Sequence, residues 1–209
     1  MVERMLLHWS PRSPFVRKMM IAAYELGLAG RIDRVRTVVG GTVPHLDLMR
    51  QNPLGRLPTL VAADGTVVQD SAVICEYFDT LAGGGGLFPA AGSERLTALC
   101  RQALGDGMME VGLLWLGERA RPLAMRSPAH IDLWRLKLRA AVDALEGEAA
   151  ALAATPFDIG VLTVGTALSY LDFRFADEAW RDGHPGLAAW HAEFDRRPSV
   201  LATLPVDDS

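Results

Sequence analysis

The chain has 209 residues, of which 50% are apolar and 22% are charged, and its formal net charge is −4. This balance is typical of a compactly folded protein and gives no electrostatic reason to expect nucleic acid or an anionic membrane as a partner, because both require clustered Lys and Arg. Two cysteines, Cys75 and Cys100, predict neither a disulfide framework nor a metal site. This cysteine usage fits a reducing cytoplasm best, and the first residues do not resemble a secretory signal.

The first part of the sequence alternates between strand patterns and helical patterns. An apolar run at Met5–Trp9 predicts a strand, and the helical spacing of Pro14–Leu28 predicts a helix that Gly27 ends. The alternation in Ile32–Val39 predicts a second strand. A strand, a helix and a strand in this order form a right-handed crossover, so we expect the two strands to be parallel.

A hairpin and another helix are expected next. Val43–Arg50 predicts a short helix, and Pro58–Ala62 and Thr66–Gln69 predict two strands joined by a turn at Asp64-Gly65. Ser71–Leu81 returns to helical spacing. The predicted order is therefore β-α-β-α-β-β-α.

The run Gly83–Gly86 interrupts the helical pattern and predicts a domain boundary. We expect a first domain over residues 1–82, a linker over 83–89 and an all-helical domain over 90–209. The nearly apolar stretch Ile159–Leu171 predicts a buried helix in the second domain, helical spacing continues over Thr163–Phe175, and Thr163 is a candidate N-cap. The apolar stretch is shorter than the ~20 residues that cross a bilayer.

Three segments carry the candidate chemistry, and the first is Ser13-Pro14 at the start of the first helix. Ser is a favoured N-cap and Pro a favoured first helical residue, so one interpretation is structural. The other is functional, because a helix N-terminus stabilises an anion and a thiol held there loses its proton more readily.

The second segment runs from Asn52 to Leu60, with Pro58 at the start of a strand. Pro58 is either an ordinary trans proline of an edge strand or follows a cis peptide bond. The cis form would turn the chain and present the backbone of Leu57 to an extended peptide ligand. The third segment is Asp70-Ser71, which caps the next helix or receives the carboxylate and ammonium groups of an amino acid.

These segments, in this order and at these spacings, resemble the glutathione S-transferase family over nearly the whole chain. The matching motifs are Asn52-Pro53, Gly55, Leu57-Pro58 and Asp70-Ser71. The run from Ser13 to Lys18 looks like a bacterial, serine-type branch of the family, in which Ser13 stands at the catalytic position and Ser10 is the nearby competitor.

The resemblance implies an α/β thioredoxin-like domain followed by a C-terminal helical bundle. It also implies a homodimer that binds glutathione as a co-substrate, needs no other cofactor and conjugates small electrophiles, as in detoxification. Ser13 would be the catalytic residue. Glutathione would bind at Leu57, Pro58, Asp70, Ser71, Arg56 and His45, and the second substrate at Trp9, Arg12, Phe15, Met108 and Trp115.

Several alternatives stay open at this point. Met108 and Trp115 have the spacing of helix core residues, and Arg12 either favours an anionic substrate or is a solvated loop charge. Disulfide exchange would need a cysteine near the start of the first helix, and none is there. A protein of the same fold could also bind glutathione without turnover, or act only as an interaction module.

Overall fold

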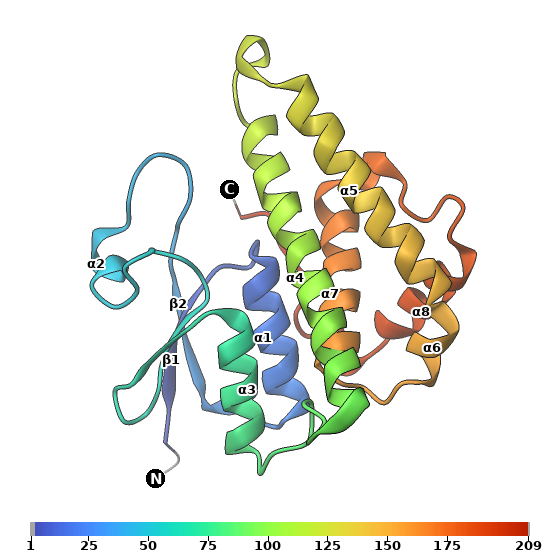
Figure 1. Ribbon diagram of the computed structural model, residues 1–209. Coiled ribbons are helices and arrows are strands. Elements are labelled where there is room, and N and C mark those ends of the chain that lie inside the picture. Colours follow the sequence, from blue (N-terminus) through green and yellow to red (C-terminus); the bar gives the residue numbers. More distant parts are fainter. Residues whose placement is uncertain (1–2, 209) are drawn as a thin grey trace. The chain divides into compact units, whose positions relative to one another are not determined.

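A computed structural model describes residues 3–208, and the chain divides into two compact units (Figure 1). The first unit comprises the chain up to Arg95 together with the segment from Pro198 onward, and the second is Leu96–Arg197. The segment from Pro198 belongs to the first unit because helix α9 (Pro198–Leu201) packs against α1 (Pro14–Glu25). The first unit therefore combines residues from both ends of the sequence.

The described part of the first unit contains a sheet of four strands in the order β2-β1-β3-β4. Strands β1 (Met5–Trp9) and β2 (Ile32–Arg36) are parallel, as the crossover predicts. Strand β3 (Thr59–Val61) is antiparallel to β1, and β4 (Val67–Gln69) is antiparallel to β3. Strands β1, β2 and β4 therefore end at one edge of the sheet, and β3 begins at that same edge.

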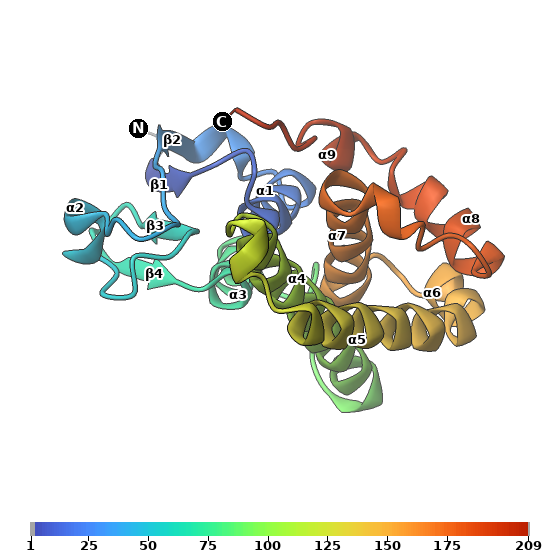
Figure 2. The same cartoon turned by 90° about the horizontal axis from the view of Figure 1, so that it is seen from above.

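Helices α1 and α3 (Ser71–Leu81) pack against each other on one side of this sheet, and α2 (Leu46–Met49) lies on the other side (Figure 2). Between α1 and β2 the chain forms a short 3-10 turn, Ala29–Arg31. Helix α1 ends as predicted at Gly27, which has a φ of 70°, and the Leu28 N–H donates to the Ala23 carbonyl. This is the Schellman arrangement, in which a left-handed glycine lets the last carbonyls find donors.

The glycine-rich segment after α3 is held by one buried carboxylate. Asp79 of α3 accepts hydrogen bonds from the backbone N–H groups of Gly85, at 2.8 Å, and Leu87, at 2.7 Å. These bonds satisfy donors of a segment that has no regular secondary structure of its own. The expected linker, residues 83–89, thus lies within the first unit, before the division at Arg95.

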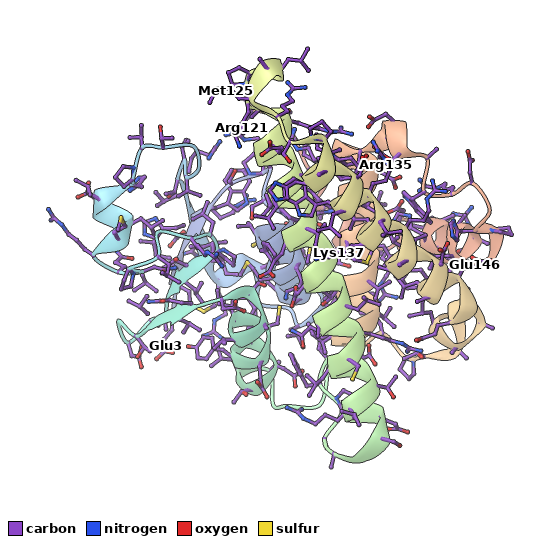
Figure 3. The ribbon with its side chains drawn as sticks, turned by 45° about the horizontal axis from the view of Figure 1, so that its top comes forward. Glu3, Arg121, Met125, Arg135, Lys137 and Glu146 are labelled. Carbon is purple, nitrogen blue, oxygen red and sulfur yellow. The ribbon has the colours of Figure 1, made fainter. Side chains whose placement is uncertain are left out.

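The second unit is helical, and close approaches between helices organise it. A Cβ added at Gly105 would lie 2.9 Å from the Thr163 backbone, and one at Gly165 would overlap the Phe194 ring. Only glycine permits such contacts. Glu146 (Figure 3) accepts from the backbone N–H groups that begin α8. The helices are α4 (Gly92–Arg119), α5 (Pro128–Gly147), α6 (Ala149–Ala154), α7 (Ile159–Arg174) and α8 (Pro185–Phe194), with 3-10 turns at Leu123–Met125 and Ala176–Glu178.

The buried helix α7 begins at Ile159, the first residue of the apolar stretch that predicts it, and Thr163 is not its cap. Its N-cap is Asp158, whose carboxylate accepts from the Val161 N–H at 2.8 Å. Thr163 lies inside the helix and donates its hydroxyl to the Ile159 carbonyl, so the prediction that it caps the helix is wrong. The apolar spacing continues on both sides of Thr163, so the spacing alone does not identify the cap. Among the described residues, no helix is long and apolar enough to cross a membrane.

A buried histidine connects α7 and α8. His191 is fully buried, and its Nε2 lies 3.2 Å from the Gly165 carbonyl oxygen and 3.1 Å from the Ser169 hydroxyl. Arg181 donates to the His191 Nδ1 at 3.2 Å, which assigns the ring hydrogen to Nε2. Burial lowers the pKa of His191, although the Asp195 and Asp172 carboxylates act in the opposite direction.

We expect this histidine to make folding stability depend on pH. The unfolded chain takes up a proton at His191 near its ordinary pKa of 6.5 and the folded chain at a lower pH. His191 therefore contributes stability above pH 6.5, and the contribution is lost as the pH falls from there through the folded pKa. The melting temperature should rise as the pH increases toward 6.5, and His191→Gln should remove this rise.

His184→Gln is the matched control for that measurement. Asp143 raises the pKa of His184, so its contribution is complete below pH 6.5 and is lost as the pH rises through the folded pKa. The control should keep the rise that His191→Gln removes. A rise that persists in His191→Gln would contradict the assignment.

Candidate functional site

The edge of the sheet where β1 ends brings together the three candidate segments. Ser13 follows the end of β1, Asp70 directly follows the end of β4, and Pro58 directly precedes the start of β3. In the sheet register Thr59 lies opposite both His8 and Gln69, so these three residues are at the same position along their strands. The antiparallel direction of β3 is what brings its first residue to the edge where the other strands end.

Ser13 is the N-cap of α1, and this role leaves its hydroxyl hydrogen available. The Ser13 Oγ accepts a hydrogen bond from the Val16 N–H at 3.2 Å. A serine hydroxyl has two lone pairs and one O–H donor, and the cap uses one lone pair. The structural and functional interpretations of Ser13 are therefore compatible.

Ser10, the competitor of Ser13, is buried in the loop between β1 and α1. Its hydroxyl accepts from the Arg12 N–H at 3.4 Å, and its carbonyl accepts from the Ser13 N–H at 3.3 Å. Ser13 is the more exposed of the two serines. This geometry favours Ser13 as the hydroxyl that a ligand reaches.

The peptide bond between Leu57 and Pro58 is cis, the alternative that the sequence associates with a peptide ligand. Asn52 organises the loop before it. The buried Asn52 amide donates to the Arg56 carbonyl at 3.2 Å and to the Thr59 hydroxyl at 2.9 Å. We did not predict this role, and the turn residues that follow Asn52 were the only signal for it.

Asp70 has a backbone conformation that is rare for a residue with a side chain. Its φ is 72° and its ψ is 136°, and its carboxylate accepts from the Ala72 N–H at 2.7 Å as the N-cap of α3. Such a conformation costs of order 1–3 kcal/mol and is found where surrounding structure or function requires it. Asp70 is exposed, and Ser71 beside it is buried.

Arg56 and His45 occupy different environments. The Arg56 side chain is exposed, and its carbonyl accepts from the Thr59 hydroxyl at 2.8 Å. His45 caps α2, because its Nδ1 accepts from the Leu48 N–H at 3.1 Å. The neutral ring must then carry its hydrogen on Nε2, which is a donor for an acceptor outside the helix.

The candidates for the second substrate are divided between the two units. In the first unit, Trp9 and Phe15 are half-buried, and Arg12 forms an ion pair with Asp208. In the second unit, Met108 is 3% exposed and Trp115 is 1% exposed. Met108 and Trp115 are thus core residues, as their helical spacing indicates. That they line a second-substrate pocket together with Trp9, Arg12 and Phe15 stays a prediction.

Trp115 lines a cavity inside the second unit, together with Leu138, Phe175 and Trp180. Trp115 packs against the Phe175 ring, with centroids 4.8 Å apart. The cavity measures about 40 Å³, whereas ligand pockets usually have some 300–1,000 Å³. It is too small to hold a second substrate.

Within the described residues, Asp172, His191 and Asp195 have ligand atoms close enough together to bind a metal ion. Arg181, however, donates to the Asp172 carboxylate and to the His191 ring. Its guanidinium already supplies a cation to this cluster. The arrangement is therefore explained as a polar network between α7 and α8 around the buried His191.

Two sequence models of known domains match the chain. The glutathione S-transferase N-terminal domain matches residues 12–81, which include Ser13, Leu57-Pro58 and Asp70-Ser71. The glutathione S-transferase C-terminal domain matches residues 128–193. The first match covers the three segments that meet at the sheet edge.

Whole-chain comparisons give the same result. The uncharacterized GST-like protein YibF of Escherichia coli K12 is 30% identical, over 96% of this chain and 98% of its own length. A glutathione transferase family member from Pseudomonas fluorescens Pf-5, solved with bound glutathione, is 40% identical with a TM-score of 0.93, over 97% of this chain and 99% of that one. A glutathione S-transferase from Methylobacillus flagellatus KT, solved with glutathione bound, is 28% identical with a TM-score of 0.88, over 97% and 100%. The thioredoxin-like domain and the helical domain are thus confirmed, and the chain belongs to the glutathione S-transferase family.

Proposed function

We propose that this protein is a glutathione transferase in which Ser13 activates the thiol of bound glutathione for attack on a small electrophile. The observation that carries the proposal is the meeting of Ser13, Leu57-Pro58 and Asp70-Ser71 at one edge of the sheet. A tripeptide laid along this edge can contact all three segments, because they follow or precede adjacent strand ends.

Each part of glutathione has a partner of suitable chemistry at this edge. Asp70 offers a carboxylate to the γ-glutamyl ammonium group, and Ser71 and the α3 N-terminus offer donors to its carboxylate. The backbone of Leu57 pairs with the extended peptide. The cationic Arg56 and the Nε2 of His45 are donors for the glycyl carboxylate.

Ser13 acts by hydrogen bonding and not as a covalent nucleophile. Its free O–H donates to the glutathione sulfur, and such a charge-assisted bond is worth about 1.5–3 kcal/mol. This would lower the thiol pKa by roughly one to two units. With an aryl chloride, the thiolate forms the carbon–sulfur bond, chloride leaves with the electron pair of the broken bond, and the thiol proton passes to solvent.

A relative supports the idea that a substituent on sulfur is accommodated. The Pseudomonas fluorescens Pf-5 protein has also been solved with bound S-(propanoic acid)-glutathione, in a structure 39% identical to this chain with a TM-score of 0.89. We extend this to the present chain as part of the proposal. The alternative, a glutathione-binding protein without turnover, differs only in the rate of conjugation.

The test of catalysis compares two serines. Calorimetry should detect glutathione binding to the wild-type protein, and Ser13→Ala should slow conjugation of chlorodinitrobenzene by roughly tenfold or more, because the thiol pKa returns toward its free value. Ser13→Asp keeps a capping acceptor but has no donor, so it should also slow the reaction without a large loss in melting temperature. Ser10→Ala is the matched control and should react like the wild type.

Two results would contradict this assignment. An unchanged rate in Ser13→Ala removes Ser13 from the mechanism, and a loss confined to Ser10→Ala transfers its role to Ser10. Glutathione binding without any measurable wild-type conjugation would favour the non-catalytic alternative.

The role of Asp70 is separable from its role as a helix cap. Asn and Asp are comparable N-caps, but only Asp offers a negative charge to an ammonium group. Asp70→Asn should therefore keep the melting temperature and weaken glutathione binding in calorimetry by about tenfold, the loss of one charge-assisted bond. Asp64→Asn, in the turn between β3 and β4, is the control, because this carboxylate also accepts a local backbone N–H. Equal affinities in both variants would show that Asp70 only caps the helix.

We also propose that the protein is a homodimer, which the family resemblance suggests. Exposed apolar side chains at the turn between α4 and α5 support a partner surface in the second unit. Leu123 is 79% exposed and Met125 (Figure 3) is 58% exposed. Light scattering should give the mass of two chains. A single-chain mass at micromolar concentration would contradict the proposal.

A further inference from the structure

A carboxylate of the chain itself is held between two arginines beside Ser13. Asp208 accepts from the Arg36 Nε at 2.6 Å and from the Arg36 Nη2 at 2.9 Å. The Arg12 Nε lies 3.1 Å from the same carboxylate. Arg36 is itself oriented by donation to the Thr37 carbonyl at 2.9 Å.

The two arginines belong to the edge that carries the candidate glutathione site. Arg12 directly precedes Ser13, and Arg36 is the last residue of β2, opposite Trp9 in the parallel register. The segment that carries Asp208 also touches the loop, because the Val206 N–H donates to the Pro11 carbonyl at 3.3 Å. Asp208 thus reaches the immediate neighbourhood of the proposed reaction centre.

The chemistry of this cluster is that of carboxylate recognition. A guanidinium presents parallel N–H donors that match the two oxygens of a carboxylate, and Arg36 binds Asp208 in this bidentate manner. Arg36 and Arg12 lower the pKa of Asp208, so it stays charged at neutral pH. The structure therefore shows the two arginines with the class of ligand that they suit.

The Asp208 carboxylate is also held in a way that lets another carboxylate displace it from the two arginines. The side chains of Arg12, Arg36 and Asp208 are 29%, 30% and 31% exposed. Ion pairs at this exposure contribute little to stability, because water competes for both partners. The segment before Asp208 has no regular secondary structure after α9, so no helix or strand must break for it to leave.

We propose that Arg12 and Arg36 form an anion subsite for a carboxylate on the electrophile, and that Asp208 occupies this subsite until such an electrophile displaces it. The proposal rests on the proposed function, since it assigns the substrate class of the same site. Because Asp208 belongs to the same chain, it competes at a high effective concentration. It should therefore raise the KM of anionic electrophiles and leave that of neutral ones unchanged.

The test uses two electrophiles that differ only in charge, chlorodinitrobenzoate and its neutral amide. Asp208→Asn keeps the shape of the side chain and removes its charge. It should lower the KM of the benzoate by up to about fivefold, the effect of one exposed ion pair, and leave the KM of the amide unchanged. Adding Arg12→Gln or Arg36→Gln to Asp208→Asn should abolish this decrease in the KM of the benzoate.

Asp33→Asn is the matched control. Asp33 forms a bidentate pair with Arg4 in the same unit, near the opposite ends of β1 and β2. Removing this charge should change neither KM. A similar decrease in the KM of the benzoate in Asp33→Asn would show that the effect reflects only the net charge of the protein. This result would overturn the proposal.

Other outcomes also decide the matter. If Asp208→Asn slows the conjugation of both electrophiles equally and lowers the melting temperature, the segment that carries Asp208 only stabilises the loop before Ser13. The proposal is then wrong. If the wild type neither binds glutathione nor conjugates the amide, the proposed function fails, and the subsite is then tested alone. Calorimetry with unreactive dinitrobenzoate should still show tighter binding to Asp208→Asn than to the wild type, and equal binding would overturn the subsite.

Discussion

The direction of four short strands determines where the chemistry of this protein can be. Because β1, β2 and β4 run the same way, the residues that follow them leave the sheet at one edge, and the opposite direction of β3 brings its first residue to that edge as well. Ser13, Pro58 and Asp70 are 12 or more positions apart in the sequence but become neighbours of adjacent strand ends. A reversal of β3 would move Pro58 to the far edge and separate it from the others.

Helix capping and ligand binding use the same groups here without competing. Ser13, His45 and Asp70 each accept a backbone N–H at the start of a helix. Each of these side chains still has unused hydrogen-bonding capacity, namely a hydroxyl hydrogen, a ring N–H and a second carboxylate oxygen. The cap fixes the side chain in place, so a ligand would meet a group that is already oriented. Rigid placement of this kind reduces the entropy lost on binding.

The two units differ in what holds them together. The first depends on a small sheet and on backbone groups satisfied by Asn52 and Asp79, because its loops are long relative to its strands. The second depends on close helix contacts at glycine and on a buried polar network around His191. Burial lowers the pKa of His191, so the expected pH response of stability belongs to the unit that does not contain Ser13.

The sequence by itself determined the strands, the starts of α1 and α3 and the candidate segments, because periodicity, capping and turn preferences depend on residues a few positions apart. Local pattern gave a wrong cap for α7, since Thr163 lies inside the apolar spacing and the cap at Asp158 is a single side chain. It also left open whether the peptide bond before Pro58 is cis, and it did not predict the hydrogen bonds of the Asn52 amide. Only the tertiary structure showed that Arg12 forms an ion pair with Asp208, a carboxylate of its own chain. Its partner Asp208 also binds Arg36, 172 positions away in the sequence, and no local preference encodes a contact at that separation.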